Sequence, residues 1–161
     1  MSQPPRQKEG VCGFHSFNLD ARNAMKTSVL SSLRSVIEVI ELVPAKMEGS
    51  QLSRAGYDAI ITAEVEGYSL ELELSERFFT ADIIAEAELR IAFTAETAAG
   101  RTTGGTFDED SEHKNGLGTL CSGVNTASSK AVEKVMGAAA SELSERISNS
   151  DRLRKAIGER I

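Results

Sequence analysis

The sequence predicts an α+β fold, in which two main α-helices pack on one face of an antiparallel β-meander of three to four strands. The first observation is residues 83–95, where every odd position is apolar and polar side chains such as Glu86, Glu88 and Arg90 lie between them. This alternation is typical of a strand with one buried and one solvated face, as in antiparallel sheets covered on one side. The second observation is two segments, over residues 21–38 and 126–148, whose apolar positions recur at helical spacing.

The N-terminal third is expected to hold a tail, a short strand and the first main helix. Residues 1–10 are rich in Pro, Gln and charge, which is typical of a disordered tail. Residues 11–161 are expected to form a single α+β domain, since their number is ordinary for one core. Within it, the apolar residues 11–17 predict an edge strand, residues 21–38 the first helix, and residues 45–56 a connecting loop.

Residues 57–74 predict a long strand with a β-bulge. Apolar residues occupy odd positions over residues 59–65 and even positions over residues 68–74, so the parity changes at Gly67. A slip of one residue would turn all later side chains to the wrong face of the sheet. We therefore expect one extra residue at Glu66–Gly67, which keeps the apolar side chains on one face.

The C-terminal half completes the meander and adds the second main helix. Residues 98–100 predict a turn that leads into a third strand over residues 101–108. Residues 109–123 are polar and are expected to form a loop before the helix over residues 126–148. A short final helix is expected over residues 151–157.

The distribution of charge argues against a nucleic-acid partner. The formal net charge is −6, and residues 57–96 alone hold ten acidic residues against two basic ones. Such a sheet would repel a phosphate backbone. Aromatic residues make up 5% of the chain and Trp is absent, so a platform for stacking bases is not expected either. No apolar run approaches the roughly 20 residues that span a bilayer.

We assign no catalytic residue, no cofactor-binding residue and no metal ligand, and we expect neither a cofactor nor an enzyme. His15 and His113 lie in no Ser/His/Asp or Cys/His pattern. The glycines of residues 100–105 and 116–118 match no phosphate-binding motif. Residues 108–113 carry oxygen ligands for a divalent cation but lack the spacing of an EF-hand, so a solvated acidic loop is favoured over a metal site.

The solvated face of the sheet is the best candidate for a functional surface. Its carboxylates recur at strand spacing, which is also what an ordinary solvated face would show. The functional interpretation is a docking surface that selects a basic partner. The residues of this candidate partner-docking face are Glu71, Glu73, Glu86, Glu88 and Arg90.

The two cysteines leave two alternatives open. Cys12 and Cys121 are far apart in the sequence and belong to no C-x-x-C motif. They are compatible with one disulfide that closes a long loop, or with two unrelated thiols.

Several segments resemble the YajG-type lipoproteins of Gram-negative bacteria. They are Arg-Phe-Phe-Thr-Ala-Asp-Ile-Ile-Ala-Glu-Ala-Glu-Leu-Arg-Ile-Ala-Phe at residues 77–93, the turn at Ala99 and Gly100, and the helical patterns of residues 125–136 and 147–153. The resemblance covers roughly residues 20–160. It implies a non-enzymatic cell-envelope protein that faces the periplasm and acts by binding or assembly. It also implies an outer-membrane location, through a lipid anchor that lies outside this chain.

The same resemblance bears on the cysteines and the partner. The residues before Cys12 form no lipobox, so this cysteine is not expected to carry the lipid. An oxidising periplasm favours a disulfide between Cys12 and Cys121. The expected partner is an envelope protein or a second copy of the chain, with no nucleic acid. The alternative function is a carrier for a small apolar ligand or lipid, held in a cavity between sheet and helices.

Overall fold

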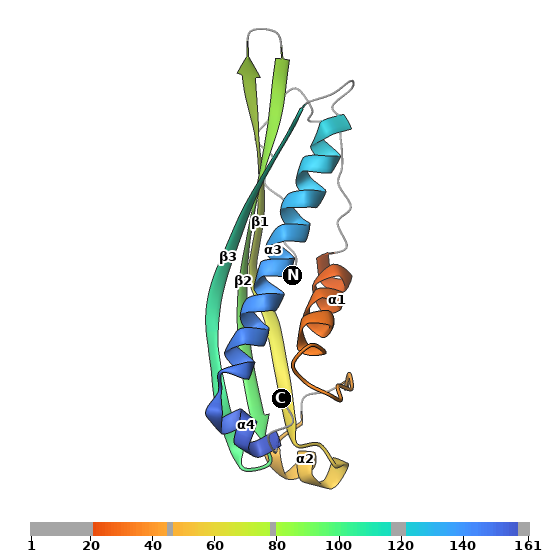
Figure 1. Cartoon of the computed structure of the whole chain (residues 1–161), viewed down its shortest axis with the longest axis vertical. Helices are drawn as coiled ribbons and strands as arrows, with labels where there is room; N and C mark the ends of the chain where they lie inside the picture. The colour runs from red at the N-terminus through yellow and green to blue at the C-terminus, as the bar shows by residue number, and fades with distance from the viewer. Residues whose placement is uncertain (1–20, 45–46, 78–79, 117–121, 158–161) are drawn as a thin grey trace.

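The computed structural model describes residues 21–44, 47–77, 80–116 and 122–157 (Figure 1). Its three strands are antiparallel and lie in the order β1-β2-β3, and the helices flank them, so the predicted α+β class is confirmed. The elements in chain order are α1 (Ala21–Leu33), α2 (Gly49–Ala55), β1 (Ala59–Arg77), β2 (Thr80–Thr97), β3 (Gly100–Gly116), α3 (Ser122–Ser148) and α4 (Asp151–Ile157).

The two main helices lie on the same side of a long, narrow sheet (Figure 1). Helix α3 runs along the sheet and contacts β2 and β3. Helix α1 makes its main contact with α3 and adds Met25 and Leu33 to the core. Among the described helices, α3 contacts β2 and β3 far more extensively than β1.

The pairing of β1 with β2 contains the predicted bulge. Val65 lies opposite Ile91, but the next pair is Gly67 opposite Arg90, so Glu66 has no partner of its own on β2. The extra residue shifts the parity of β1 by one. As a result, the apolar positions before and after the bulge face the same side of the sheet, and the prediction at Glu66–Gly67 is confirmed.

The core is built from small aliphatic side chains at the contact between β2 and α3. Every odd residue of β2 from 83 to 95 is buried, and Ala85, Ala87 and Ala95 have no exposed surface. Ala127, Ala131 and Ala139 of α3 are equally buried. Alanine has a single methyl group, so these rows let the helix backbone lie close to the sheet. The larger residues that fill the remaining space include Leu89, Ile91, Phe93, Phe107, Val124, Val132, Val135, Met136, Leu143 and Ile147.

Strand β3 is longer than the sequence predicted. The sequence placed a loop at residues 109–123, whereas the strand continues to Gly116. The reason is non-local, because β2 offers backbone hydrogen-bonding groups along its whole length and pairs with β3 down to Asp82 opposite Gly116. One polar side chain of this stretch also has a partner on the helix: the Ser111 hydroxyl donates to the Ala131 carbonyl of α3 at 2.5 Å.

The first helix is shorter than predicted. Helix α1 ends at Leu33, and residues 34–36 form a turn in which the Ile37 N–H donates to the Leu33 carbonyl at 2.8 Å. The predicted helix continued to about residue 38, but the β-branched residues that follow Leu33 have a low helix propensity. The apolar positions of residues 36–43 therefore belong to a non-helical segment.

A short helix, α2, replaces part of the loop expected over residues 45–56. The Glu48 N–H donates to the Gln51 side-chain carbonyl at 2.9 Å, which caps the start, and Gly56 at φ +79° ends the helix. A Cβ at Gly49 would lie 2.9 Å from the Ala98 carbonyl oxygen, so this glycine lets the helix abut the β2–β3 turn.

The remaining predictions divide into three groups. The final helix α4 has the predicted bounds, and α3 begins at Ser122, four residues before the expected start. The tail over residues 1–10 and the edge strand over residues 11–17 lie outside the described residues. A single domain over residues 11–161 stays a prediction.

Ala87 tests the close contact between helix and sheet. The substitution Ala87→Leu is expected to destabilise the protein by about 1–3 kcal/mol, because the added methylenes have no room beneath α3. Denaturant unfolding measures this change. The matched control is Ala92→Leu on the opposite face of the same strand, where the change is expected to stay within about 0.5 kcal/mol. Equal losses in both variants would contradict this account of the core.

Candidate functional site

The face of the sheet opposite the main helices gathers carboxylates from all three strands. Each side chain is exposed, and together they define the acidic face. Among the residues of this face whose side chains the structure describes, the basic ones are Arg90 and Lys114. The acidic face consists of Glu64, Glu66, Glu71 and Glu73 of β1, Glu86 and Glu88 of β2, and Asp108, Asp110 and Glu112 of β3.

The strand register places like charges directly opposite each other. Glu71 pairs with Glu86, and Glu86 pairs with Glu112 on its other side, so one rung of the sheet carries three carboxylates. Within the described part of the chain, these three side chains take part in no hydrogen bond or ion pair. Opposed like charges destabilise a sheet. This rung therefore lowers the stability of the fold that carries it.

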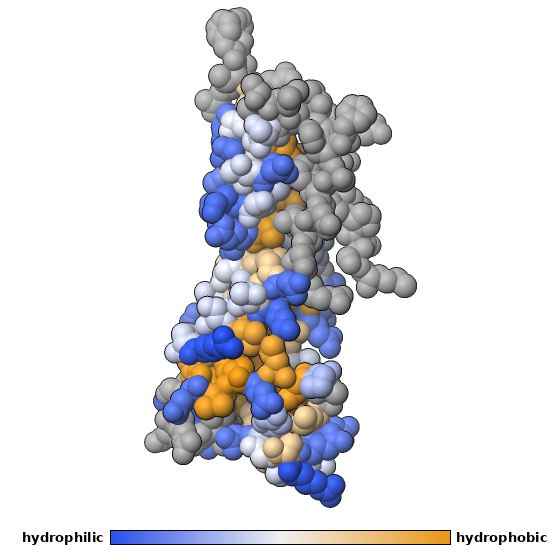
Figure 2. Space-filling model, turned by 90° about the vertical axis from the view of Figure 1, so that its right-hand side faces the viewer, coloured by the Kyte–Doolittle hydropathy of each residue, from blue (hydrophilic) through white to orange (hydrophobic). Residues whose placement is uncertain are grey.

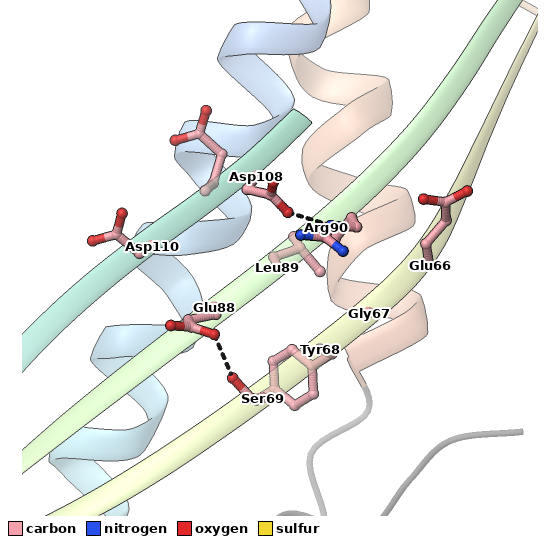
Figure 3. Close-up of a pocket in the computed structure, with 10 residues that line it drawn as sticks. Glu66, Gly67, Tyr68, Ser69, Glu88, Leu89, Arg90, Asp108 and Asp110 are labelled. Carbon is pink, nitrogen blue, oxygen red and sulfur yellow. Dashed lines mark hydrogen bonds and ion pairs between the residues drawn. The ribbon is translucent and has the colours of Figure 1, made fainter. Parts of the chain in front are cut away.

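Arg90 lies in the middle of the acidic face and is paired there (Figure 3). Its Nε donates to the Asp108 carboxylate. This hydrogen bond and the Asp108 charge raise the pKa of the Arg90 guanidinium, and the charges of Glu66 and Glu88 raise it further. Both partners are more than half exposed, so the ion pair contributes little stability. It neutralises one carboxylate and leaves most of the face negative.

An open hollow surrounds this ion pair and spans all three strands (Figure 3). On one side of it, the Ser69 hydroxyl donates to the Glu88 carboxylate at 3.2 Å. The residues that line the hollow are Glu66, Gly67, Tyr68, Ser69, Glu88, Leu89, Arg90, Asp108, Glu109 and Asp110.

The acidic face offers exposed charges rather than a desolvated acid. Catalysis by a pair of carboxylates needs one acid in a desolvated site, whereas the carboxylates of the acidic face are exposed. Among the described residues, no group of three or more His, Cys, Asp or Glu side chains is placed to hold a metal ion. In residues 108–113 the reason is the strand itself: Asp108, Asp110 and Glu112 point to the acidic face, and His113, opposite the buried Ala85, points away from it.

The structure brings together the five residues that the sequence proposed for the docking face. Glu71, Glu73, Glu86, Glu88 and Arg90 all lie on the acidic face.

Sequence reasoning missed the contribution of β3, since Asp108, Asp110 and Glu112 were assigned to the end of a strand and to a loop. The sequence did contain a signal for this longer strand. The strand before the turn at residues 98–100 was predicted to begin at residue 83, and an antiparallel partner of equal length after the turn would extend to about residue 115.

The two cysteines and one of the two histidines are not among the residues that the structure describes. Cys12, Cys121 and His15 lie outside the described residues, and the expected disulfide stays a prediction. Over the described part of the chain, no helix combines the length and hydropathy that a membrane span requires.

Comparison with known proteins gives weak similarities of fold. No protein-family model and no curated protein matches the chain. Among solved structures, the chain is similar to a minor lipoprotein from Acinetobacter baumannii, with 14% identity and a TM-score of 0.45 over 81% of this chain and 87% of that one. It is also similar to a candidate lipoprotein from Caulobacter crescentus, with 11% identity and a TM-score of 0.43 over 82% and 83% of the two chains. These similarities concern the arrangement of helices and strands, and the YajG-type assignment stays a prediction.

The rung of three glutamates predicts a stabilising substitution. Glu86→Gln is expected to stabilise the protein by up to about 1 kcal/mol at low salt, because the repulsion from Glu71 and Glu112 is removed. The gain is expected to shrink in high salt, which screens exposed charges. Thermal unfolding at two salt concentrations measures both effects. Glu73→Gln is the control, since Glu73 lies opposite Ile84 and should gain less.

Glu109 predicts a pH-dependent effect. Burial raises the pKa of this carboxyl, the charges of Glu142 and Asp110 raise it further, and Arg146 lowers it. A raised pKa in the folded state means that the ionised form destabilises the fold, and that this loss develops as pH rises through the unfolded and then the folded pKa. Glu109→Gln is therefore expected to be more stable than the wild type at pH 7, by less than about 1 kcal/mol because solvent screens the site. The advantage should vanish below about pH 4, where the carboxyl is protonated in both states.

Glu133 provides a control of opposite sign. Its hydrogen bond to Lys130 and the Lys130 charge lower the pKa of this carboxyl. The ionised form is favoured in the folded state, so Glu133→Gln should lose stability at neutral pH and not gain it. Thermal unfolding of both variants between pH 3 and pH 7 separates the two cases. A gain in both would show that removal of negative charge in general, rather than the site of Glu109, is responsible.

Proposed function

We propose that the protein is a non-enzymatic binding module of the bacterial cell envelope, and that its acidic face docks a partner with a cationic surface. The observation that supports this most is the rung Glu71–Glu86–Glu112, where three exposed carboxylates lie side by side and form no ion pair with a described residue. Lys or Arg side chains from a partner would relieve this repulsion. A fold that carries such a rung gains stability on binding a cationic surface, and gains none from an acidic or apolar one.

The geometry also indicates how the partner would be held. Neighbouring strands lie about 4.8 Å apart, so one ammonium or guanidinium group can contact carboxylates of two strands at once. The acidic face is broad and open, which suits a folded surface or an amphipathic helix better than a small molecule. Since its charges are exposed, the complex is expected to form rapidly at low salt and to weaken as salt increases.

The envelope location in this proposal rests on the sequence resemblance. On that resemblance we propose that the native protein faces the periplasm and is held at the outer membrane by a lipid. Self-association through the acidic face is disfavoured, because two copies would bring carboxylates against carboxylates. A carrier function needs a cavity beneath α3, whereas Ala87, Ala95, Ala131 and Ala139 fill that interface and have no exposed surface. We therefore favour docking of a different, cationic envelope protein.

Charge reversal on the acidic face tests the proposal. The full chain is crosslinked in native envelopes at low salt, and the yield of each crosslinked protein is compared between the wild type, Glu86→Lys and Glu145→Lys. Glu86→Lys is expected to reduce the yield of the specific partner by about tenfold, because a positive charge then stands in the middle of the docking surface. Glu145→Lys makes the same charge change at an exposed site on α3 and should retain the partner.

Two results would contradict the proposal. The first is a partner whose yield is equal in both lysine variants, which would place docking elsewhere on the molecule. The second is turnover of any substrate that depends on a carboxylate of the acidic face or on His113, which would contradict the non-enzymatic part.

A further inference from the structure

The acidic face has a gap where β1 carries Gly67. Gly67, Arg90 and Asp108 form one rung across the three strands. A Cβ built on Gly67 would lie 3.6 Å from the Arg90 Cβ, so it would point to the acidic face. Apart from its chain neighbours, no other described residue lies within 4 Å of that position. The β1 end of this rung therefore has no side chain, and the space above it belongs to the open hollow.

The ion pair of Arg90 leaves this gap unfilled. Asp108 lies on β3 and Gly67 on β1, on opposite sides of the strand that carries Arg90. Because Arg90 Nε donates to the Asp108 carboxylate, the guanidinium is held toward β3 (Figure 3). The one basic side chain that lines the hollow is thus turned away from Gly67.

Two carboxylates flank the gap. Glu66 precedes Gly67 on β1 and forms no hydrogen bond or ion pair with a described residue. On the neighbouring rung, the Ser69 hydroxyl donates to the Glu88 carboxylate at 3.2 Å, which holds that carboxylate toward β1 (Figure 3). The charges of Glu66 and Glu88 both act on the Arg90 guanidinium without bonding to it. A cation placed over Gly67 would therefore lie between two carboxylates that have no basic partner of their own among the described residues.

A long cationic side chain fits this gap. Its methylene groups can lie over the bare backbone of Gly67 while its charged end donates to Glu66 and Glu88. A carboxylate from a partner does not fit, because Arg90 is already paired and the two flanking glutamates would repel it.

We propose that the hollow over Gly67 receives one Lys or Arg side chain of the docked partner, and that this side chain anchors the partner on the acidic face. The inference rests on the proposed function and adds a fixed point of contact to it. Arg90 and Glu86 are four residues apart on β2, so the anchor lies about 13 Å from the rung of three glutamates. The two places are far enough apart to be tested separately.

Filling the gap without changing any charge tests the inference. The probe is a synthetic octapeptide in which Lys and Ser alternate, and its Kd for the full chain is measured at low salt. Gly67→Thr is expected to weaken binding about fivefold, because the new side chain occupies the space of the anchor. The control Gly116→Thr makes the same substitution on the same face at the end of β3, where a Cβ meets no atom within 4 Å. It should change Kd by less than about twofold.

The fold of Gly67→Thr is checked by thermal unfolding. Gly67 does not have a positive φ, and threonine is a better strand residue than glycine, so the variant should unfold at the wild-type temperature or above. Weaker binding by a protein that is at least as stable identifies the filled gap as the cause.

Glu66→Gln provides an independent measurement. Since the anchor contacts this carboxylate, the substitution should weaken peptide binding about threefold in the wild type and by less than that in the Gly67→Thr background. Additive losses would show that Glu66 attracts the peptide only through the general charge of the face, and would overturn the inference.

The remaining outcomes separate this inference from the proposed function. A peptide that binds Gly67→Thr as tightly as the wild type, but is weakened by Glu86→Lys, would overturn the anchor alone. A loss in Gly67→Thr without a loss in Glu86→Lys would support the anchor and contradict docking across the rung of three glutamates. Equal losses in Gly67→Thr and Gly116→Thr would show that the gap has no special part in binding.

Discussion

Helix α3 packs along the odd-numbered row of β2, where alanines on both partners allow the two backbones to come close together. The organisation of the molecule depends on this contact. It fixes which face of β2 is dry, and through the register of β1 and β3 it fixes the solvated face of the whole sheet. The odd-numbered residues of β2 face α3, so Glu86 points to the opposite, solvated face. The register of β1 and β3 places Glu71 and Glu112 beside it on the same rung.

The same contact explains why the helix covers the strands of the sheet unequally. A single long helix with a narrow apolar stripe covers about two strands, and α3 lies over β2 and β3. Helix α1 packs on α3, and its early end at Leu33 leaves the apolar residues that follow in a non-helical segment. Strand β3 is consequently hydrogen-bonded to α3 through Ser111 and Lys134, whereas β1 pairs only with β2 among the described strands. The unequal coverage of the strands follows from the size and placement of one helix.

Local periodicity was enough to predict β2, the bulge in β1 and the helix α4, because in each case apolar side chains alternate or recur with the period of the element. It failed where another element imposes the structure. The second half of β3 is polar on both faces and forms a strand because β2 provides backbone partners for it. The residues of the candidate site show the same difference. Glu71, Glu86 and Glu88 could be placed on the solvated face from the alternation within their own strands. Asp110 and Glu112 could be placed there only from the pairing of β3 with β2. Helix α2 was missed although Glu48 and Gln51 stand at the spacing of a capping box.

The bulge at Glu66 also constrains how this protein can change in length. Successive side chains of β1 alternate between the two faces of the sheet, and the bulge is the one position in its pairing with β2 where this alternation shifts by one residue. Inserting or deleting one residue on either side of it would exchange the apolar and acidic faces of everything beyond. In homologous chains, insertions and deletions in this strand should therefore come two residues at a time, or be accompanied by the loss or gain of a bulge. Either change keeps the same side chains on the same face of the sheet.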